Sequence, residues 1–156
     1  MDDAVDQFRA AVDSFVDKAE RLDPDVLEEE PAPGEWSVKE IAAHTAEIFT
    51  YWARQLEHLS QRPGTAFGRT VDDPARALFV ETHKHTVIDD LIRRVRVGEA
   101  EAVTAVRFFD TDQWQGTTGI HPVRGEMTIE AIFRAFLLEH AEDHLKQLDE
   151  TVKAVS

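Results

Sequence analysis

Apolar side chains recur every three or four residues in four segments of the chain, which is the spacing of one buried face of a helix. The first segment covers about residues 3–22, and Asp23-Pro24 ends it. Its apolar positions form a single stripe: Val5, Phe8, Val12, Phe15, Ala19 and Leu22. The spacing therefore predicts an amphipathic helix, followed by a linker that contains prolines and a glycine.

The second helix has a well-defined predicted start. Ser37 and Glu40 form the capping-box pattern S-x-x-E, in which each side chain accepts a hydrogen bond from a backbone N–H of the other residue. Apolar residues then follow at helical spacing up to Pro63-Gly64, where the helix is predicted to end. These residues are Ile41, Ile48, Trp52, Leu56 and Leu59.

The third helix is predicted to begin at Asp73-Pro74, because aspartate caps a helix and proline is tolerated at its first position. Its apolar positions continue to Val95. Gly98 is predicted to interrupt the helix, and residues 99–109 are predicted to form a short extra helix.

The fourth helix is predicted from about Thr128 to Val152. Residues 110–127, which precede it, are predicted to form a long loop without regular structure, and such loops often cover a binding site. No segment alternates apolar and polar residues for long enough to indicate a strand. We therefore predict an all-α fold, a four-helix bundle with a short extra helix and a long loop before the last helix, in a single domain over residues 1–156.

The composition excludes several kinds of chemistry and partner. The chain has no cysteine, so any thiol in its reaction must come from another molecule. Its 31 acidic and 17 basic residues give a formal charge of −14, which repels phosphate backbones and anionic lipids. We expect a small-molecule substrate, and neither nucleic acid nor a membrane as partner. The acidic first residues and the lack of a long apolar run favour a cytoplasmic location.

Three of the seven histidines fall on buried faces of predicted helices. His44 lies in the apolar stripe of the second helix. His140 and His144 are four residues apart on the fourth helix, so their side chains lie about 5–6 Å apart on one face. Buried imidazoles need partners for their ring nitrogens, and a shared metal ion supplies them together. We therefore predict a divalent metal site formed by His44, His140 and His144, at similar depth if the two helices pack antiparallel.

Two other interpretations of these histidines are open. They could be core histidines or members of a buried hydrogen-bond network. A metalloprotease would require H-E-x-x-H, but Ala141 follows His140, and the inverted pattern H-x-x-E-H is matched only in part because Asp143 replaces its glutamate.

Further residues are candidates for the surroundings of the site. His85 falls on the apolar stripe of the third helix, as a core histidine or a pocket residue. Trp114, His121 and Arg124 lie in the long loop and are candidates for lining or covering the pocket, and Trp114 could instead anchor the loop.

Three acidic residues are candidates for a base or for a partner of a metal-binding histidine. They are Glu47, one turn from His44, and Glu139 and Asp143 beside the histidine pair. A solvated helix face is the alternative for each of them.

Two stretches resemble the DinB/YfiT-like superfamily of damage-inducible four-helix-bundle metalloproteins. EWSVKEIAAH at residues 35–44 is similar to the W-S-x-x-E-x-x-x-H pattern that starts the family's second helix. HPVRGEMT at residues 121–128 and LEHAEDHLKQL at residues 138–148 resemble its G-x-x-T and H-x-x-x-H-x-x-Q-L patterns. The resemblance implies the same three-histidine site near one end of the bundle, and often a homodimer. Some relatives transfer low-molecular-weight thiols or isomerise thiol-linked substrates.

Three protein ligands leave coordination positions open, as in catalytic metal sites. Imidazole ligands suit zinc, nickel, copper or iron, so the sequence leaves the element open. The leading hypothesis is a metal-dependent enzyme, a transferase that uses a low-molecular-weight thiol such as bacillithiol or mycothiol. The alternatives are a metal-dependent hydrolase and a non-catalytic protein that binds a metal or a small ligand.

Overall fold

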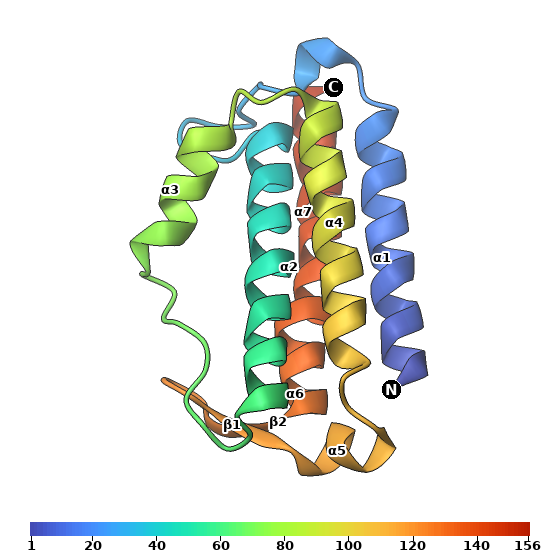
Figure 1. The fold of residues 1–156 in the computed structure, drawn as a ribbon. Coiled ribbons are helices and arrows are strands. Elements are labelled where there is room, and N and C mark those ends of the chain that lie inside the picture. The colour runs from blue at the N-terminus through green and yellow to red at the C-terminus, as the bar shows by residue number, and fades with distance from the viewer.

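A computed structural model describes all residues, 1–156, and shows four long helical segments packed as a bundle (Figure 1). These are α1 (Asp2–Glu20), α2 (Val38–Gln61), α4 (Ile88–Val106) and a last segment made of α6 (Ile129–Phe133) and α7 (Glu139–Val155). A 3-10 turn, Pro24–Val26, lies in the linker between α1 and α2. The predicted four-helix bundle is confirmed.

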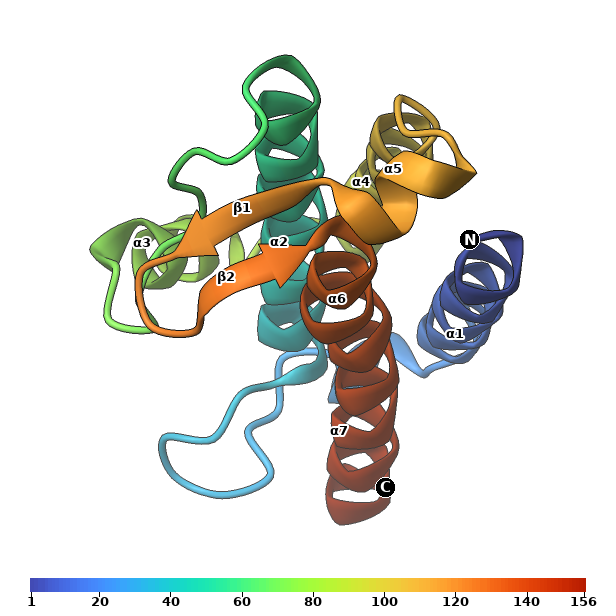
Figure 2. The same ribbon diagram turned by 90° about the horizontal axis from the view of Figure 1, so that it is seen from below.

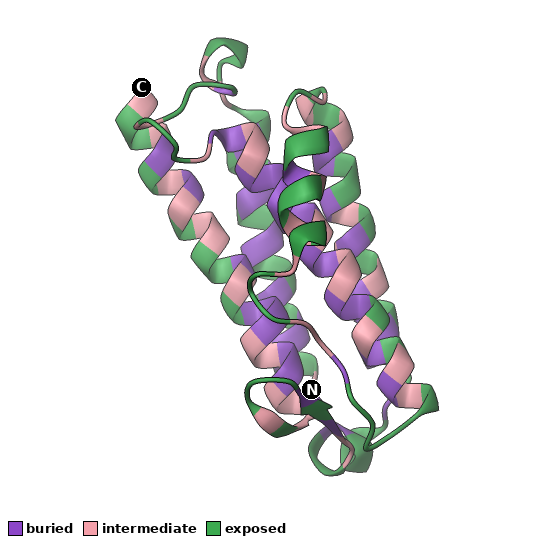
Figure 3. Ribbon diagram, turned by 90° about the vertical axis from the view of Figure 1, so that its left-hand side faces the viewer, coloured by how far each residue is buried: buried purple, intermediate pink, exposed green.

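The direction of the helices explains where the sequence interpretation failed in the third segment. α2 and α4 run in one direction, while α1 and α7 run in the other (Figure 1). Because α2 and α4 are parallel, the chain must return along the bundle between them. It does so through α3 (Pro74–His83), which lies beside the bundle and is largely exposed (Figure 3). The helical break therefore falls at residues 84–87, where the chain reverses, and not at Gly98.

Gly98 lies inside α4, and its small size serves the packing of α4 on α2. A Cβ atom at this position would lie 2.8 Å from Cβ of Phe49 and 3.3 Å from the backbone nitrogen of Thr50. Contact this close requires glycine, so α4 continues through Gly98 without an interruption. The short helix predicted at residues 99–109 is the second half of α4.

The segment before the last helix is ordered, contrary to the prediction of a structureless loop. It contains α5 (Thr111–Gly116) and an antiparallel hairpin of β1 (Thr118–His121) and β2 (Gly125–Thr128), which lie across one end of the bundle (Figure 2). The linker after α2 extends this hairpin, because Phe67 N–H donates to the carbonyl of Ile120 at 3.0 Å. Strands of four residues give too few alternations to be recognised in the sequence.

The last helical segment contains a π-helical turn, Arg134–Leu138, between α6 and α7. The backbone N–H of Glu139 donates to the carbonyl of Arg134, five residues back. Such turns are frequent at functional sites, and this one ends two residues before His140.

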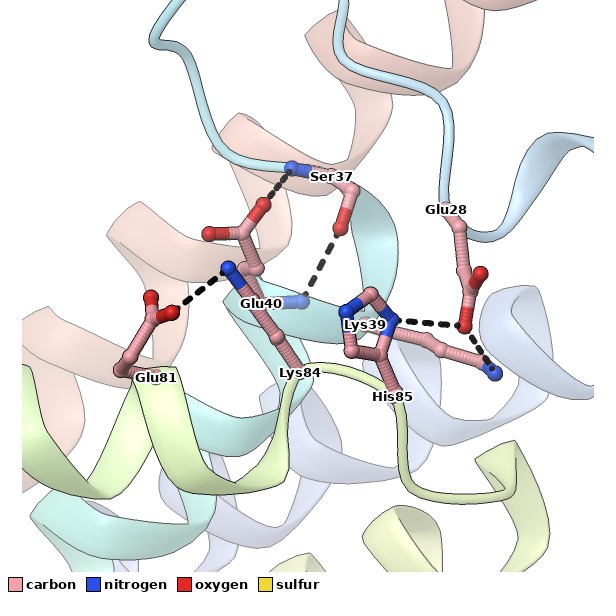
Figure 4. Close-up of polar contacts among 7 residues, drawn as sticks. All are labelled: Glu28, Ser37, Lys39, Glu40, Glu81, Lys84 and His85. Atoms are coloured by element: carbon pink, nitrogen blue, oxygen red, sulfur yellow. Dashed lines mark hydrogen bonds and ion pairs between the residues drawn. The ribbon is translucent and has the colours of Figure 1, made fainter.

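The predicted caps and the apolar core are present. Ser37 and Glu40 exchange the two hydrogen bonds of the capping box, at 3.2 and 3.3 Å (Figure 4). The buried apolar side chains form one continuous cluster in which Phe8 makes edge contacts with Phe49 and Phe133. None of the helices combines the length and the apolar character needed to cross a membrane.

Candidate metal centre and adjoining cavity

The antiparallel contact of α2 with α7 brings the three predicted histidines together. The ring centre of His44 lies 4.8 Å from that of His144, and the ring centre of His144 lies 5.9 Å from that of His140. His44 is buried, with 4% of its surface exposed, and the other two are half-buried. The ring of Trp36, 4.7 Å away, packs against His44.

The separation of the rings fits a shared metal ion. Two imidazoles that bind one metal through nitrogen–metal bonds of about 2.0–2.1 Å have ring centres roughly 5 Å apart. As the side chains stand, however, no group of three or more His, Cys, Asp or Glu residues is positioned to hold a metal ion. The two ring separations are therefore close to that of a shared ion, while the three side chains do not stand in a metal-binding arrangement in this structure.

The hydrogen bonding of the three rings is incomplete. Nδ1 of His44, Nδ1 of His140 and Nε2 of His144 are buried and have no hydrogen-bond partner. Leaving a buried polar atom unpaired costs about 1–3 kcal/mol. No other buried side-chain nitrogen or oxygen in the chain lacks a partner. The cost is concentrated at this one cluster, which points to a ligand that would satisfy it.

Gln147 orients one of the rings. Its Oε1 lies 3.2 Å from Nδ1 of His144, and because an amide oxygen only accepts, Nδ1 carries the proton and donates. The lone pair of His144 is therefore on the unpartnered Nε2. Metal-binding histidines commonly donate their other N–H to such a partner. The sequence analysis singled out Gln147 only as part of a family pattern.

The rings are held in the neutral form that metal binding requires. Burial is the main cause that lowers the pKa of His44 to about 2 and that of His144 to about 4. Burial also lowers the pKa of His140, against the opposing effects of the Phe136 carbonyl, which is near the ring but outside regular hydrogen-bond geometry, and of the Asp143 carboxylate. Neutral imidazole at neutral pH is a competent metal ligand.

A cavity of about 330 Å³ adjoins His140. Its apolar wall includes Trp52 and Phe136, whose rings are stacked with centres 4.0 Å apart. His121, a candidate from the sequence, also lines it, and its ring is stacked on Phe136 with centres 5.1 Å apart. Three arginines complete the lining: Arg69, Arg76 and Arg124. A larger cavity of about 780 Å³ between α2, α3 and α4 contains none of the three clustered histidines.

The hydrogen bonds of His121 fix its tautomer. Its Nδ1 accepts from the backbone N–H groups of Val123 and Arg124, at 3.2 and 3.1 Å. The ring proton is therefore on Nε2, and burial together with the charge of Arg124 lowers its pKa. His121 thus presents a neutral N–H donor and cannot act as a base through Nδ1.

Glu47 forms an ion pair with Arg69. Its two carboxylate oxygens accept from both terminal nitrogens of Arg69, at 2.6 and 2.7 Å, and the side chains are only 10% and 12% exposed. The Arg69 guanidinium also covers the ring of Tyr51 at 3.8 Å. A carboxylate bound in this way is occupied and is poorly placed to serve as a general base.

Two predicted pocket residues lie elsewhere. His85 is in the turn after α3, its side chain is 74% exposed and its Nδ1 lies 3.4 Å from Glu28, because α3 ends before the apolar stripe reaches it (Figure 4). Trp114 is buried on α5 and packs on Phe133 at 5.6 Å, so it anchors α5 and does not line the cavity. Asp143 is exposed on α7, near enough to raise the pKa of His140 and His144.

The sequence analysis missed Arg69 and Arg76. Both follow α2, in a segment whose course along the bundle depends on the parallel arrangement of α2 and α4. No pattern in the sequence signals that these arginines meet Arg124 and His140.

The fold and the cluster define a class of protein, four-helix bundles with histidines from two helices gathered beside a small cavity. The family model of the DinB superfamily matches residues 6–148, and the chain belongs to this superfamily.

Solved structures similar to this chain have the same fold. YfiT from Bacillus subtilis, described as a probable metal-dependent hydrolase with an unusual four-helix bundle topology, has a TM-score of 0.81 at 13% identity, with 97% of this chain and 85% of that chain covered. TT2238, a four-helix bundle protein, has a TM-score of 0.71 at 19% identity, with 96% and 98% covered.

A mycothiol-dependent maleylpyruvate isomerase has a TM-score of 0.69 at 16% identity, and the similarity covers 97% of this chain but only 59% of that chain. No curated protein sequence matches the chain. At these identities the similarity concerns the fold, and the function must be argued from the site.

Proposed function

We propose that His44, His140 and His144 bind one divalent metal ion and that the protein is a metal-dependent enzyme acting on a small molecule in the adjoining cavity. The observation that carries this proposal is the set of three unpartnered buried nitrogens on rings 4.8 and 5.9 Å apart. Core histidines would be expected to have hydrogen-bond partners. The names of two similar structures, a metal-dependent hydrolase and a mycothiol-dependent isomerase, support the same interpretation.

The residues around the cluster favour a thiol-dependent reaction over hydrolysis. A divalent metal held by three neutral imidazoles supplies the positive charge that stabilises the deprotonated form of a thiol or water. The chain contributes His121 and the cations Arg76 and Arg124 to the lining of the cavity, and one predicted base, Glu47, is already bound to Arg69.

A reaction that needs no protein base suits this lining. We therefore place transfer or isomerisation with an external low-molecular-weight thiol first, since the chain has no cysteine of its own. Metal-dependent hydrolysis is the second candidate, and Glu139 and Asp143, exposed beside the histidine pair, are the carboxylates left for it. A protein that only binds a metal or small ligand is the non-enzymatic alternative. The homodimer that the resemblance implies stays a prediction, which analytical ultracentrifugation tests.

The experiment is a metal-binding titration of purified protein against a chromogenic chelator, with zinc and nickel. We expect one metal ion per chain, and a loss of at least about a hundredfold in affinity for His44→Ala, His140→Ala and His144→Ala, because each removes one of three ligands. His85→Ala is the matched control, since His85 is exposed and outside the cluster. Equal metal binding by the control and the three variants would contradict the proposal.

Activity is measured second, on fully metal-loaded protein. Electrophiles offered together with bacillithiol or mycothiol test the transferase, and activated esters and amides test the hydrolase. Turnover that depends on thiol and disappears in His44→Ala, with the helical circular dichroism unchanged, supports the first candidate. Tight metal binding without turnover on either panel would favour the non-enzymatic alternative.

A further inference from the structure

Two arginines of the cavity beside His140 have no partner in the protein. Arg76, on α3, and Arg124, between the two strands, both line the cavity. Neither guanidinium takes part in any of the chain's ion pairs or side-chain hydrogen bonds, and that of Arg124 lies 4.9 Å from the centre of the Phe136 ring. The chain has 31 acidic residues and 17 basic ones, so carboxylates are abundant. Two unpaired guanidiniums at one cavity therefore form a local reversal of the overall charge.

The third arginine of the cavity shows the contrast. Arg69 is held by Glu47 through two short contacts, so its charge is neutralised within the protein. Arg76 and Arg124 have no such carboxylate, and a planar guanidinium is well suited to a two-point contact with a carboxylate or a phosphate.

The lining of the cavity also has an aromatic part. Trp52 and Phe136 both line it, and their rings are stacked on each other at an interplanar angle of 9°. His121 adds a neutral N–H donor at the same surface. A volume of about 330 Å³ is at the lower end of the range for small-molecule sites. The lining thus combines a small aromatic surface with two cations at its margin.

The cavity and the histidine cluster share His140. A divalent cation bound at the cluster would add to the positive charge of the two arginines, and an anion in the cavity would offset it.

We propose that the substrate of this site is a small organic anion, whose carboxylate or phosphate group binds between Arg76 and Arg124 while its apolar part lies on Trp52 and Phe136. The reacting end would then point to His140, which belongs both to the cavity and to the cluster. This inference rests on the proposed function for its reaction, but the binding of the anion is a property of the cavity alone. It can be measured in protein without metal.

The test compares three probes of similar shape on metal-free protein: benzoate, phenyl phosphate and neutral benzamide. Binding is followed by isothermal titration calorimetry and by tryptophan fluorescence, since Trp52 forms part of the wall. The salt concentration is kept at about 0.15 M, so that long-range repulsion of the anionic probes by the overall charge is screened. Keeping the protein free of metal prevents direct coordination of the anion from being mistaken for binding to the arginines.

We expect at least one anion to bind about tenfold or more tightly than benzamide, and Arg76→Gln and Arg124→Gln each to weaken it by about tenfold, as the loss of a charge-assisted hydrogen bond predicts. The double variant should bind anion and benzamide equally. Arg9→Gln, which removes one exposed positive charge on α1, is the matched control and should bind as the unchanged protein does.

The comparison of benzoate with phenyl phosphate tells which anionic group the cavity prefers. Equal binding of anions and benzamide, no binding of any probe, or an effect of the arginine variants no larger than that of Arg9→Gln would each overturn the proposal. None of these outcomes depends on metal binding, which the chelator titration measures separately. The anion site and the metal site can therefore fail independently.

Discussion

Replacing His44 by leucine should make the metal-free protein more stable. His44 is buried and its Nδ1 has no partner, while leucine has a similar volume and no polar atom. Removing an unpaired buried polar atom should raise the free energy of unfolding by about 1–3 kcal/mol. For a chain of this size each kcal/mol raises Tm by about 2–4 °C, so we expect an increase of roughly 2–12 °C.

Bound metal should make the unchanged protein more stable than His44→Leu. The unchanged protein should gain about 4 kcal/mol when metal is about a thousandfold above its Kd, because only the folded state has the site. His44→Leu loses a ligand and should gain far less. The assay is thermal unfolding by circular dichroism, once with a chelator and once with zinc. A variant that is more stable without metal and less stable with it would identify histidines retained for binding at a cost in stability.

His121→Leu is the matched control for this prediction. His121 is also buried, but its Nδ1 accepts two backbone hydrogen bonds, so its replacement should lower the stability with or without metal. If His44→Leu destabilised the metal-free protein as His121→Leu does, the reasoning would be refuted. His44 would then be an ordinary partnered core histidine.

Three further predictions follow from the same contacts. The pKa of His44 is about 2 in the folded protein, so only the unfolded chain takes up a proton at this ring as the pH falls below about 6.5. The free energy of unfolding of the metal-free protein should therefore drop by about 2 kcal/mol between about pH 6.5 and pH 5. Urea unfolding measures this drop, which should be smaller in His44→Leu. Gly98→Ala should cost about 1–3 kcal/mol by overpacking α4 on α2, whereas Gly116→Ala, which meets open space, should cost less than 1 kcal/mol. Glu47→Gln alone should lower the free energy of unfolding by about 3 kcal/mol, because Arg69 is left unpaired. The double variant Glu47→Leu with Arg69→Met should lower it by less. Chemical denaturation of the two proteins measures both values.

The candidate metal ligands could be predicted from the sequence for a local reason. His140 and His144 are four residues apart in an α-helix, and the geometry of one turn places them together without reference to the rest of the fold. His44 could be added because the capping box at Ser37 fixes the phase of α2 and with it the buried face. Local sequence patterns were enough to predict a residue's face wherever that face depends on a single helix.

The surroundings of the cluster could not be predicted in this way. Arg76 and Arg124 are distant in sequence, and they share a cavity only because α3 returns along the bundle and the hairpin folds across its end. The periodicity puts His85 on a buried face only if the third segment is one helix, whereas the chain reverses between α3 and α4, where His85 lies. The spacing of these residues along the sequence does not predict which of them lie close together in the fold.

The sequence by itself determined the class of fold, the two ends of α2 and the absence of cysteine chemistry, and it predicted the three candidate metal ligands. The tertiary structure decided which charges stand beside them: Glu47 is bound to Arg69, while Arg76 and Arg124 are left free. The physical reason is that helical periodicity acts over one or two turns, whereas the pairing of charges depends on how segments far apart in the chain are packed.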